Sequence, residues 1–170
     1  CPELDPDCGV VLHLFEADRP FHPERLHAAL DVLLEGVVSA RGRLWLADEP
    51  ESVLWLESAG GGLGISRGGR WLAADPAAPA DAARHALAAL MWDPVHGDRH
   101  TSLTVLCHRA DPQEIDEALR SALVTDAEIA RGSAYLESLP SPFGDGHQDP
   151  CDDLDPVEAA GESINERGEQ

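Results

Sequence analysis

The sequence predicts an α+β domain in which one mostly antiparallel sheet carries helices on one face, an arrangement compatible with a ferredoxin-like core. Three observations predict this class. Residues 23–35 have helical periodicity and are followed at once by a strand-like segment. Short apolar segments separated by turn residues then follow between residues 52 and 73, as in a meander. A last strand-like segment, 101–108, lies between two further helical segments.

The first helix has the clearest start and stop. His22 occupies the N-cap position, and Pro23 occupies the first helical position, where its missing N–H costs nothing. Phe21 and Leu26 have the spacing of a hydrophobic staple, and Gly36 can end the helix in a left-handed conformation. Leu26, Leu30, Leu33 and Leu34 recur at helical spacing along it.

The strands are rich in β-branched, leucine and tryptophan residues. They are expected at residues 9–17, 37–47, 52–58, 63–67, 71–73 and 101–108. Arg41 and Gly42 predict a bulge or a bend in the second strand. The glycines of 60–64 predict a turn, and residues 67–70 a second one.

Three more helices follow from capping and periodicity. Residues 80–91 are rich in alanine with an apolar face. Asp111, Pro112 and Glu114 have the pattern of an N-cap, a first helical residue and a capping box, and Ile115, Leu119 and Leu123 form a stripe behind them. Thr125 and Glu128 repeat the capping pattern and predict a last helix that ends near Leu139.

Composition divides the chain into three parts. Residues 1–8 look like the end of a linker, 9–143 like a folded domain, and 144–170 like an acidic tail. The tail is expected to be disordered, because residues 145–170 contain nine acids and one base. The chain begins at Cys1 and not at Met, which suggests a part of a longer protein.

Charge and motifs exclude several function classes. The net charge of −20 argues against direct contact with nucleic acid or an anionic membrane. No apolar run is long enough to span a bilayer, and no secretory segment is visible, so a cytoplasmic location is expected. The sequence has no lysine and therefore no P-loop, so the chain should not bind or hydrolyse GTP. No catalytic triad is apparent, and we expect no enzyme.

Metal ligands are considered at three places. His147 and Cys151, four positions apart in GHQDPCDD, could form a zinc site with neighbouring carboxylates, and Cys1 or Cys8 could join it. The pair His96 and His100 lies in a turn, so the helical spacing argument does not apply. Cys107 and His108 are adjacent on a strand and point to opposite faces. The cysteines are otherwise expected to be free thiols.

The tryptophans allow two interpretations. Core packing is the ordinary role of Trp45, Trp55, Trp71 and Trp92. A tryptophan on an exposed sheet face could instead anchor a partner protein, which makes Trp45, Trp55 and Trp71 the candidates for partner binding.

Several segments in the same order carry a family resemblance. They are RPFHPERL (19–26), the Val37-Val38 strand, RGRLWLAD (41–48), WLESAG (55–60), Gly69-Arg70-Trp71, GDRH (97–100) and LVTDAEIA (123–130). Over 9–143 the chain resembles the C-terminal domain of the CobW family of P-loop GTPases. The tail segment SPFGDGHQDPC resembles an actinobacterial branch of that family.

The resemblance implies a function that the residues alone do not. Proteins of this family look like metal-handling GTPases tied to zinc homeostasis or to metal delivery to a target enzyme. Their P-loop and Cys-rich metal motif belong to the N-terminal domain and are missing here. The chain is thus expected to be a non-catalytic interaction or regulatory domain that holds no cofactor of its own.

The resemblance also implies partners. These are the GTPase domain of the same protein or of a separate chain, and a target metalloprotein. Part of the actinobacterial branch is associated with growth at low zinc and with ribosome remodelling, so a ribosome-associated protein is a further expected partner. The alternative is a small independent zinc-binding module that uses His147 and Cys151.

Overall fold

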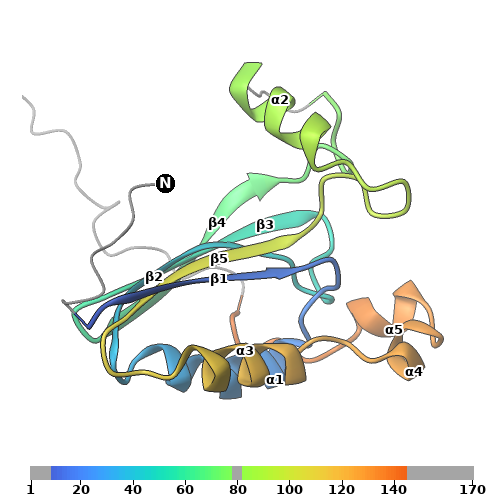
Figure 1. Ribbon diagram of the computed structural model, residues 1–170. Helices are drawn as coiled ribbons and strands as arrows, with labels where there is room; N and C mark the ends of the chain where they lie inside the picture. The colour runs from blue at the N-terminus through green and yellow to red at the C-terminus, as the bar shows by residue number, and fades with distance from the viewer. Residues whose placement is uncertain (1–8, 78–81, 145–170) are drawn as a thin grey trace, which may run out of the picture.

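The computed structural model describes residues 9–77 and 82–144, and five strands in these ranges form one sheet. The strands are β1 (Val11–Ala17), β2 (Val37–Leu44), β3 (Ser52–Ala59), β4 (Gly62–Arg70) and β5 (Thr101–Cys107). Their spatial order is β1-β5-β2-β3-β4, and every neighbouring pair is antiparallel (Figure 1). With its helices, this sheet confirms the predicted α+β class.

Most of the helical structure covers one face of the sheet. The α-helices α1 (Pro23–Ala29) and α3 (Pro112–Ser121) lie below the sheet in Figure 1, together with the 3-10 helix η2 (Leu30–Leu33). The short helices α4 (Asp126–Ile129) and α5 (Ser133–Glu137) lie beyond one end of it. Helix α2 (Ala82–Leu90) is the exception to the predicted one-sided arrangement, because it stands on the opposite side of the sheet.

The strand order contains one split β-α-β unit. Strands β1 and β2 are joined through α1 and η2 and run parallel to each other, with β5 inserted between them. A ferredoxin-like core needs a second such crossover. Within the described residues, the strands on either side of α2, β4 and β5, run antiparallel to each other, so only half of that arrangement is present.

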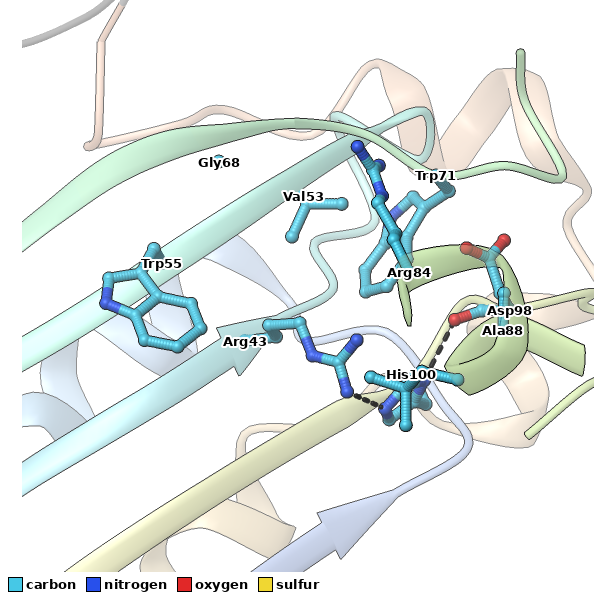
Figure 2. A pocket seen from close by; sticks show the side chains of 10 residues that line it. Arg43, Val53, Trp55, Gly68, Trp71, Arg84, Ala88, Asp98 and His100 are labelled. Carbon is cyan, nitrogen blue, oxygen red and sulfur yellow. Dashed lines mark hydrogen bonds between the residues drawn. The ribbon is translucent and has the colours of Figure 1, made fainter. Parts of the chain in front are cut away.

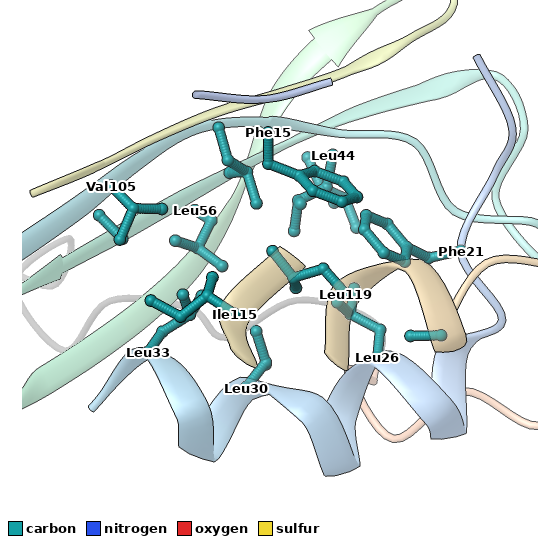
Figure 3. Close-up of a cluster of buried hydrophobic side chains, with 14 of the residues drawn as sticks. Phe15, Phe21, Leu26, Leu30, Leu33, Leu44, Leu56, Val105, Ile115 and Leu119 are labelled. Carbon is teal, nitrogen blue, oxygen red and sulfur yellow. The ribbon is translucent and has the colours of Figure 1, made fainter. Parts of the chain in front are cut away.

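The main core lies between the sheet and the layer of α1, η2 and α3. Alternate residues of the strands point into it, and the leucines of the first helical segment meet them from the other side (Figure 3). Its fully buried members include Phe15, Phe21, Leu26, Leu33, Leu56, Leu103, Val105, Ile115 and Leu119. Cys107 is a buried free thiol in the same cluster, as expected.

The first helix begins as predicted and ends earlier. His22 is the N-cap and Pro23 follows it, but the His22 side chain makes no capping hydrogen bond. Phe21 fixes the entry instead, because its ring is buried and its N–H donates to the carbonyl of Trp45 at 2.8 Å. The α-helix stops at Ala29 and continues as the 3-10 helix η2, so the expected helix 23–35 is too long.

Three other expectations need correction. The pairing of β2 is regular through Gly42, and its irregularity lies between Val37 and Ser39, so the predicted bulge was misplaced. Strand β4 continues to Arg70 where a turn and a separate strand 71–73 were expected. The last helix is divided into α4 and α5 because Gly132 takes a φ of +91° between them.

Two predicted helix starts are confirmed. The Asp111 side chain accepts the backbone N–H of Gln113 at 2.9 Å. Thr125 and Glu128 form a complete capping box, in which each side chain accepts a backbone N–H from the other residue.

Candidate partner-binding surface

The face of the sheet opposite α1 and α3 has little cover. We call it the outer face, and it carries the strand residues that alternate with the core residues. Leu12 and Leu14 of β1 point to this face, and each side chain is 55% exposed. Leu106 is paired with Leu12 and is half-buried. The outer face therefore presents a short apolar strip at Leu12 and Leu14 of β1 and Leu106 of β5, whereas the β5 partner of Leu14 is Thr104.

A pocket of about 240 Å³ lies at the end of the outer face where α2 stands over the sheet. It is bounded by the sheet on one side and by α2 on the other (Figure 2). The residues that line it are Arg43, Val53, Trp55, Gly68, Trp71, Arg84, Leu87, Ala88, Asp98 and His100. We call this the Arg43 pocket.

A short chain of hydrogen bonds organises the polar wall of the Arg43 pocket. Arg43 Nη2 lies 2.9 Å from His100 Nε2, and His100 Nδ1 lies 2.8 Å from the carbonyl oxygen of Asp98 (Figure 2). Because a guanidinium can only donate and a carbonyl can only accept, Nδ1 of His100 carries the proton and Nε2 accepts. Burial lowers the pKa of His100, which agrees with a neutral ring at pH 7.

The Asp98 carboxylate has a structural role in the same wall. Its side chain is buried, and its two oxygens accept the backbone N–H groups of Leu72 and Ala73 at 3.0 and 2.9 Å. These bonds hold the segment after β4 against the loop before β5. Burial lowers the pKa of Arg43, and the nearby charge of Asp98 opposes that shift in pKa.

Helix α2 is exposed to an unusual degree for its composition. Its sequence AARHALAAL has no acidic residue, and only Ala88 is buried. Leu90 is 85% exposed, and Trp92 and Val95 beyond the helix are also exposed. A helix with so little charge is ordinarily covered on most sides. The surface of α2 thus extends the apolar character of the outer face.

The family model of the cobalamin synthesis protein CobW C-terminal domain matches residues 10–123, which is more than half of the chain. The chain belongs to this family. The family match covers all five strands and α3, so it includes the outer face and the Arg43 pocket.

Two named relatives extend the comparison of this CobW C-terminal domain. The zinc chaperone Rv0106 of Mycobacterium tuberculosis is 52% identical over 164 residues, which cover 95% of this chain and 40% of the relative. The zinc-regulated GTPase metalloprotein activator 1 of Dictyostelium discoideum is 29% identical over 136 residues, which cover 73% of this chain and 27% of the relative. The chain therefore spans at most 40% of the length of these relatives.

A solved structure is also similar to the CobW C-terminal domain described here. The Zn(II)-bound YjiA GTPase from E. coli matches with a TM-score of 0.49 and 13% sequence identity. The match covers 68% of this chain and 30% of that chain.

The three tryptophan candidates of this CobW C-terminal domain lie in different surroundings. Trp45 and Trp71 are 5% and 1% exposed and pack together with Val53, so they offer almost no surface to a partner in this structure. Their rings contact the imidazoles of His96 and His100 at centroid distances of 5.1 and 5.8 Å. Trp55 is half-buried on the outer face and lines the Arg43 pocket.

The metal candidates fall into two groups. His147 and Cys151, with Cys1 and Cys8, lie outside the described residues. Across the ranges 9–77 and 82–144, no three His, Cys, Asp or Glu side chains converge as a metal ion would require. His96 and His100 contact different tryptophans in this part of the chain.

Sequence reasoning did not find Arg43 or His100 as a pair. They are 57 positions apart and meet because β5 is inserted beside β2. The alternation of RGRL could have placed Arg41 and Arg43 on the solvent side of a strand. Over the same two ranges, no helix combines the length and apolar character needed to cross a bilayer.

Proposed function

We propose that this chain is a non-catalytic interaction domain of a CobW-like metal-handling GTPase and that it recognises a partner protein through its outer face. The observation that supports this is the one-sided cover of the sheet, which leaves Leu12 and Leu14 exposed on β1 and places the Arg43 pocket and the exposed helix α2 on the same face of the sheet. Contiguous exposed apolar surface of this kind marks interaction sites in soluble proteins.

The partner that we propose first is the P-loop GTPase domain of the same protein or of a separate chain. The family membership and the names of the relatives, a zinc chaperone and a GTPase metalloprotein activator, support this choice. A target metalloprotein would be the second partner, and a ribosome-associated protein a third, all in the cytoplasm. The domain would then regulate the GTPase or direct it to its target.

The substitution Leu14→Glu is expected to weaken binding to a separately purified GTPase domain of the mycobacterial relative at least about tenfold, because it places a charge in the apolar strip. Leu14 is already half exposed, so the fold should tolerate the change. Binding is measured by surface plasmon resonance on the immobilised chain.

The matched control is Leu34→Glu, which introduces the same charge at an exposed leucine that follows η2 in the helical layer. This variant is expected to bind like the wild type. Equal binding by all three proteins would contradict the assignment of the outer face. Tight binding of GTP and Mg²⁺ to the chain alone in calorimetry would contradict its non-catalytic role.

A second candidate function is zinc binding by His147 and Cys151, supported by the name of the 52% identical relative, a zinc chaperone. A thiolate, an imidazole and neighbouring carboxylates are a suitable ligand set for zinc. We expect Cys151→Ala to lower zinc affinity at least about tenfold in a calorimetric titration. His85→Ala, which removes an exposed histidine of α2, is the control and should bind like the wild type. The same stoichiometry and affinity in all proteins, or no binding in the wild type, would reject this function.

A further inference from the structure

Arg43 differs from most of the described arginines in its partner. Six of them form ion pairs with carboxylates, namely Arg19, Arg25, Arg41, Arg67, Arg70 and Arg120. Arg43 instead donates to the neutral ring of His100, and no carboxylate of the described residues lies within ion-pair distance of it. A neutral acceptor satisfies one N–H and supplies no countercharge, so the charge of Arg43 is balanced only in part, by the nearby carboxylate of Asp98.

The charge of Arg43 is also held in a partly desolvated place. The guanidinium lines the Arg43 pocket together with that of Arg84, and the like charge of Arg84 lowers the pKa of Arg43 further. Asp98 is the acid nearby, but both of its oxygens already accept backbone N–H groups. The walls of the pocket thus hold two guanidiniums and one carboxylate, on a chain with a net charge of −20.

The opposite wall of the pocket is apolar and open. Arg43 and Trp55 are paired across β2 and β3 and both line the pocket, with the Arg43 guanidinium turned toward His100 and the Trp55 indole on the other side (Figure 2). Gly68 of β4 leaves this wall uncovered, because a Cβ there would lie 3.6 Å from Val53 Cγ1 and 3.9 Å from Trp55 Cβ. A longer side chain at position 68 would begin beside Val53 and Trp55 and occupy space in the pocket.

We propose that the Arg43 pocket binds the carboxylate of an aspartate or glutamate side chain on the partner protein, with an apolar group next to that carboxylate packed on Trp55. The fork of N–H groups on a guanidinium matches the two oxygens of a carboxylate. This inference rests on the proposed function and adds the chemistry that the partner must present: an acidic side chain beside an apolar or aromatic one.

Two peptides that differ only in the carboxylate test the site without the partner. N-acetyl-Glu-Phe-amide is expected to shift the Trp55 indole and His100 resonances of the full chain saturably in heteronuclear NMR titrations. N-acetyl-Gln-Phe-amide should bind at least about tenfold more weakly, since it cannot form a charge-assisted pair with Arg43. Acetate alone should also bind at least about tenfold more weakly, because it lacks the group that packs on Trp55.

Two variants with a matched control separate the site from the fold. Arg43→Gln and Gly68→Leu should each lower the affinity for the Glu peptide at least about tenfold. The first removes the positive charge, and the second covers Trp55. Gly64→Leu makes the same change on the same strand away from the pocket, where a Cβ would meet Glu57 O at 4.0 Å, and should leave binding unchanged.

Three results would overturn the inference: equal binding of the Glu and Gln peptides, unchanged binding by Arg43→Gln, or acetate binding as tight as the Glu peptide. Because no partner protein is present, these results are independent of the Leu14→Glu experiment. If the peptide experiments give one of these results while Leu14→Glu weakens binding to the GTPase domain, the proposed carboxylate site is rejected and the proposed interaction surface is retained.

Discussion

The substitution Gly42→Ala is expected to destabilise the domain by about 3 kcal/mol or more, the largest effect of a single methyl group in this chain. A Cβ at position 42 would lie 2.0 Å from the carbonyl oxygen of Ser102 and 2.9 Å from the Cα of Leu103. Both are backbone atoms of β5, which is held between β1 and β2 and cannot move without disturbing two ladders. Urea unfolding followed by circular dichroism measures the loss.

Gly64→Ala is the control for a glycine on a strand of the same sheet. A Cβ there would make only an ordinary van der Waals contact, with Glu57 O at 4.0 Å. We expect a change in the free energy of unfolding below about 1 kcal/mol, because alanine suits an extended strand at least as well as glycine. If the two variants unfold at the same urea concentration, contact between the new Cβ and the β5 backbone does not destabilise the Gly42→Ala variant.

The second large effect is expected from Glu128→Gln, which should lower the free energy of unfolding at pH 7 by on the order of 2 kcal/mol. Glu128 joins α4 to α1 through two bonds from Arg25, of 2.9 and 2.7 Å. It also accepts the N–H and the hydroxyl of Thr125 at 2.7 and 2.9 Å. These donors, with the Arg25 bonds contributing most, lower the pKa of Glu128 to about 2.

The stabilisation by Glu128 should depend on pH in a direction that follows from its lowered pKa. The pKa of Glu128 is lower in the folded state than in the unfolded state, where it is about 4.3, so folding favours the ionised form. The stabilisation is fully present above about pH 5 and is lost as the pH falls toward 2. The difference in unfolding free energy between wild type and Glu128→Gln should therefore shrink between pH 5 and pH 2.

Glu57→Gln, which removes the exposed pair with Arg41, is the control. An exposed pair contributes little to stability, so this variant should unfold like the wild type at pH 7. A wild-type to Glu128→Gln difference that stays constant from pH 7 to pH 2 would show that the carboxylate charge of Glu128 does not stabilise the fold.

Features that depend on neighbouring residues in the chain could be predicted from the sequence. The helix start at Pro23 and the capping box of Thr125 and Glu128 are examples, because capping groups and backbone lie within three or four residues of each other. These patterns involve residues close together in the sequence, and the structure differs from the prediction only in where the elements end.

Features that depend on strand pairing could not be predicted in the same way. SRGGR at the end of β4 looks like a turn, yet it continues as a strand beside β3, with Arg67 and Arg70 paired to Glu49 and Glu51. Gly132 interrupts the last helix where the capping signal alone predicted continuity. The Arg43 pocket is formed by β2, β3, β4, α2 and the loop before β5 together, and no sequence motif identifies that arrangement.

The three tryptophans predicted to bind a partner show the same limit of prediction from sequence. Trp45, Trp55 and Trp71 look alike as aromatic residues in or near strands, but the sheet directs them differently. Trp45 and Trp71 pack against Val53 and the histidine loop, whereas Trp55 lies on the outer face. Which tryptophan remains available is decided by pairing register, a property of the assembled sheet.

The insertion of β5 between β1 and β2 has a consequence for how the chain acquires its structure during synthesis. Strand β1 is made first, but its ladder partner is residues 101–107, about ninety positions later. Until those residues leave the ribosome, the β2-β3-β4 meander can form alone, while the apolar β1 has no strand to join. Completion of the sheet is therefore a late event in translation, and a chain that ends before β5 would expose both halves of the core.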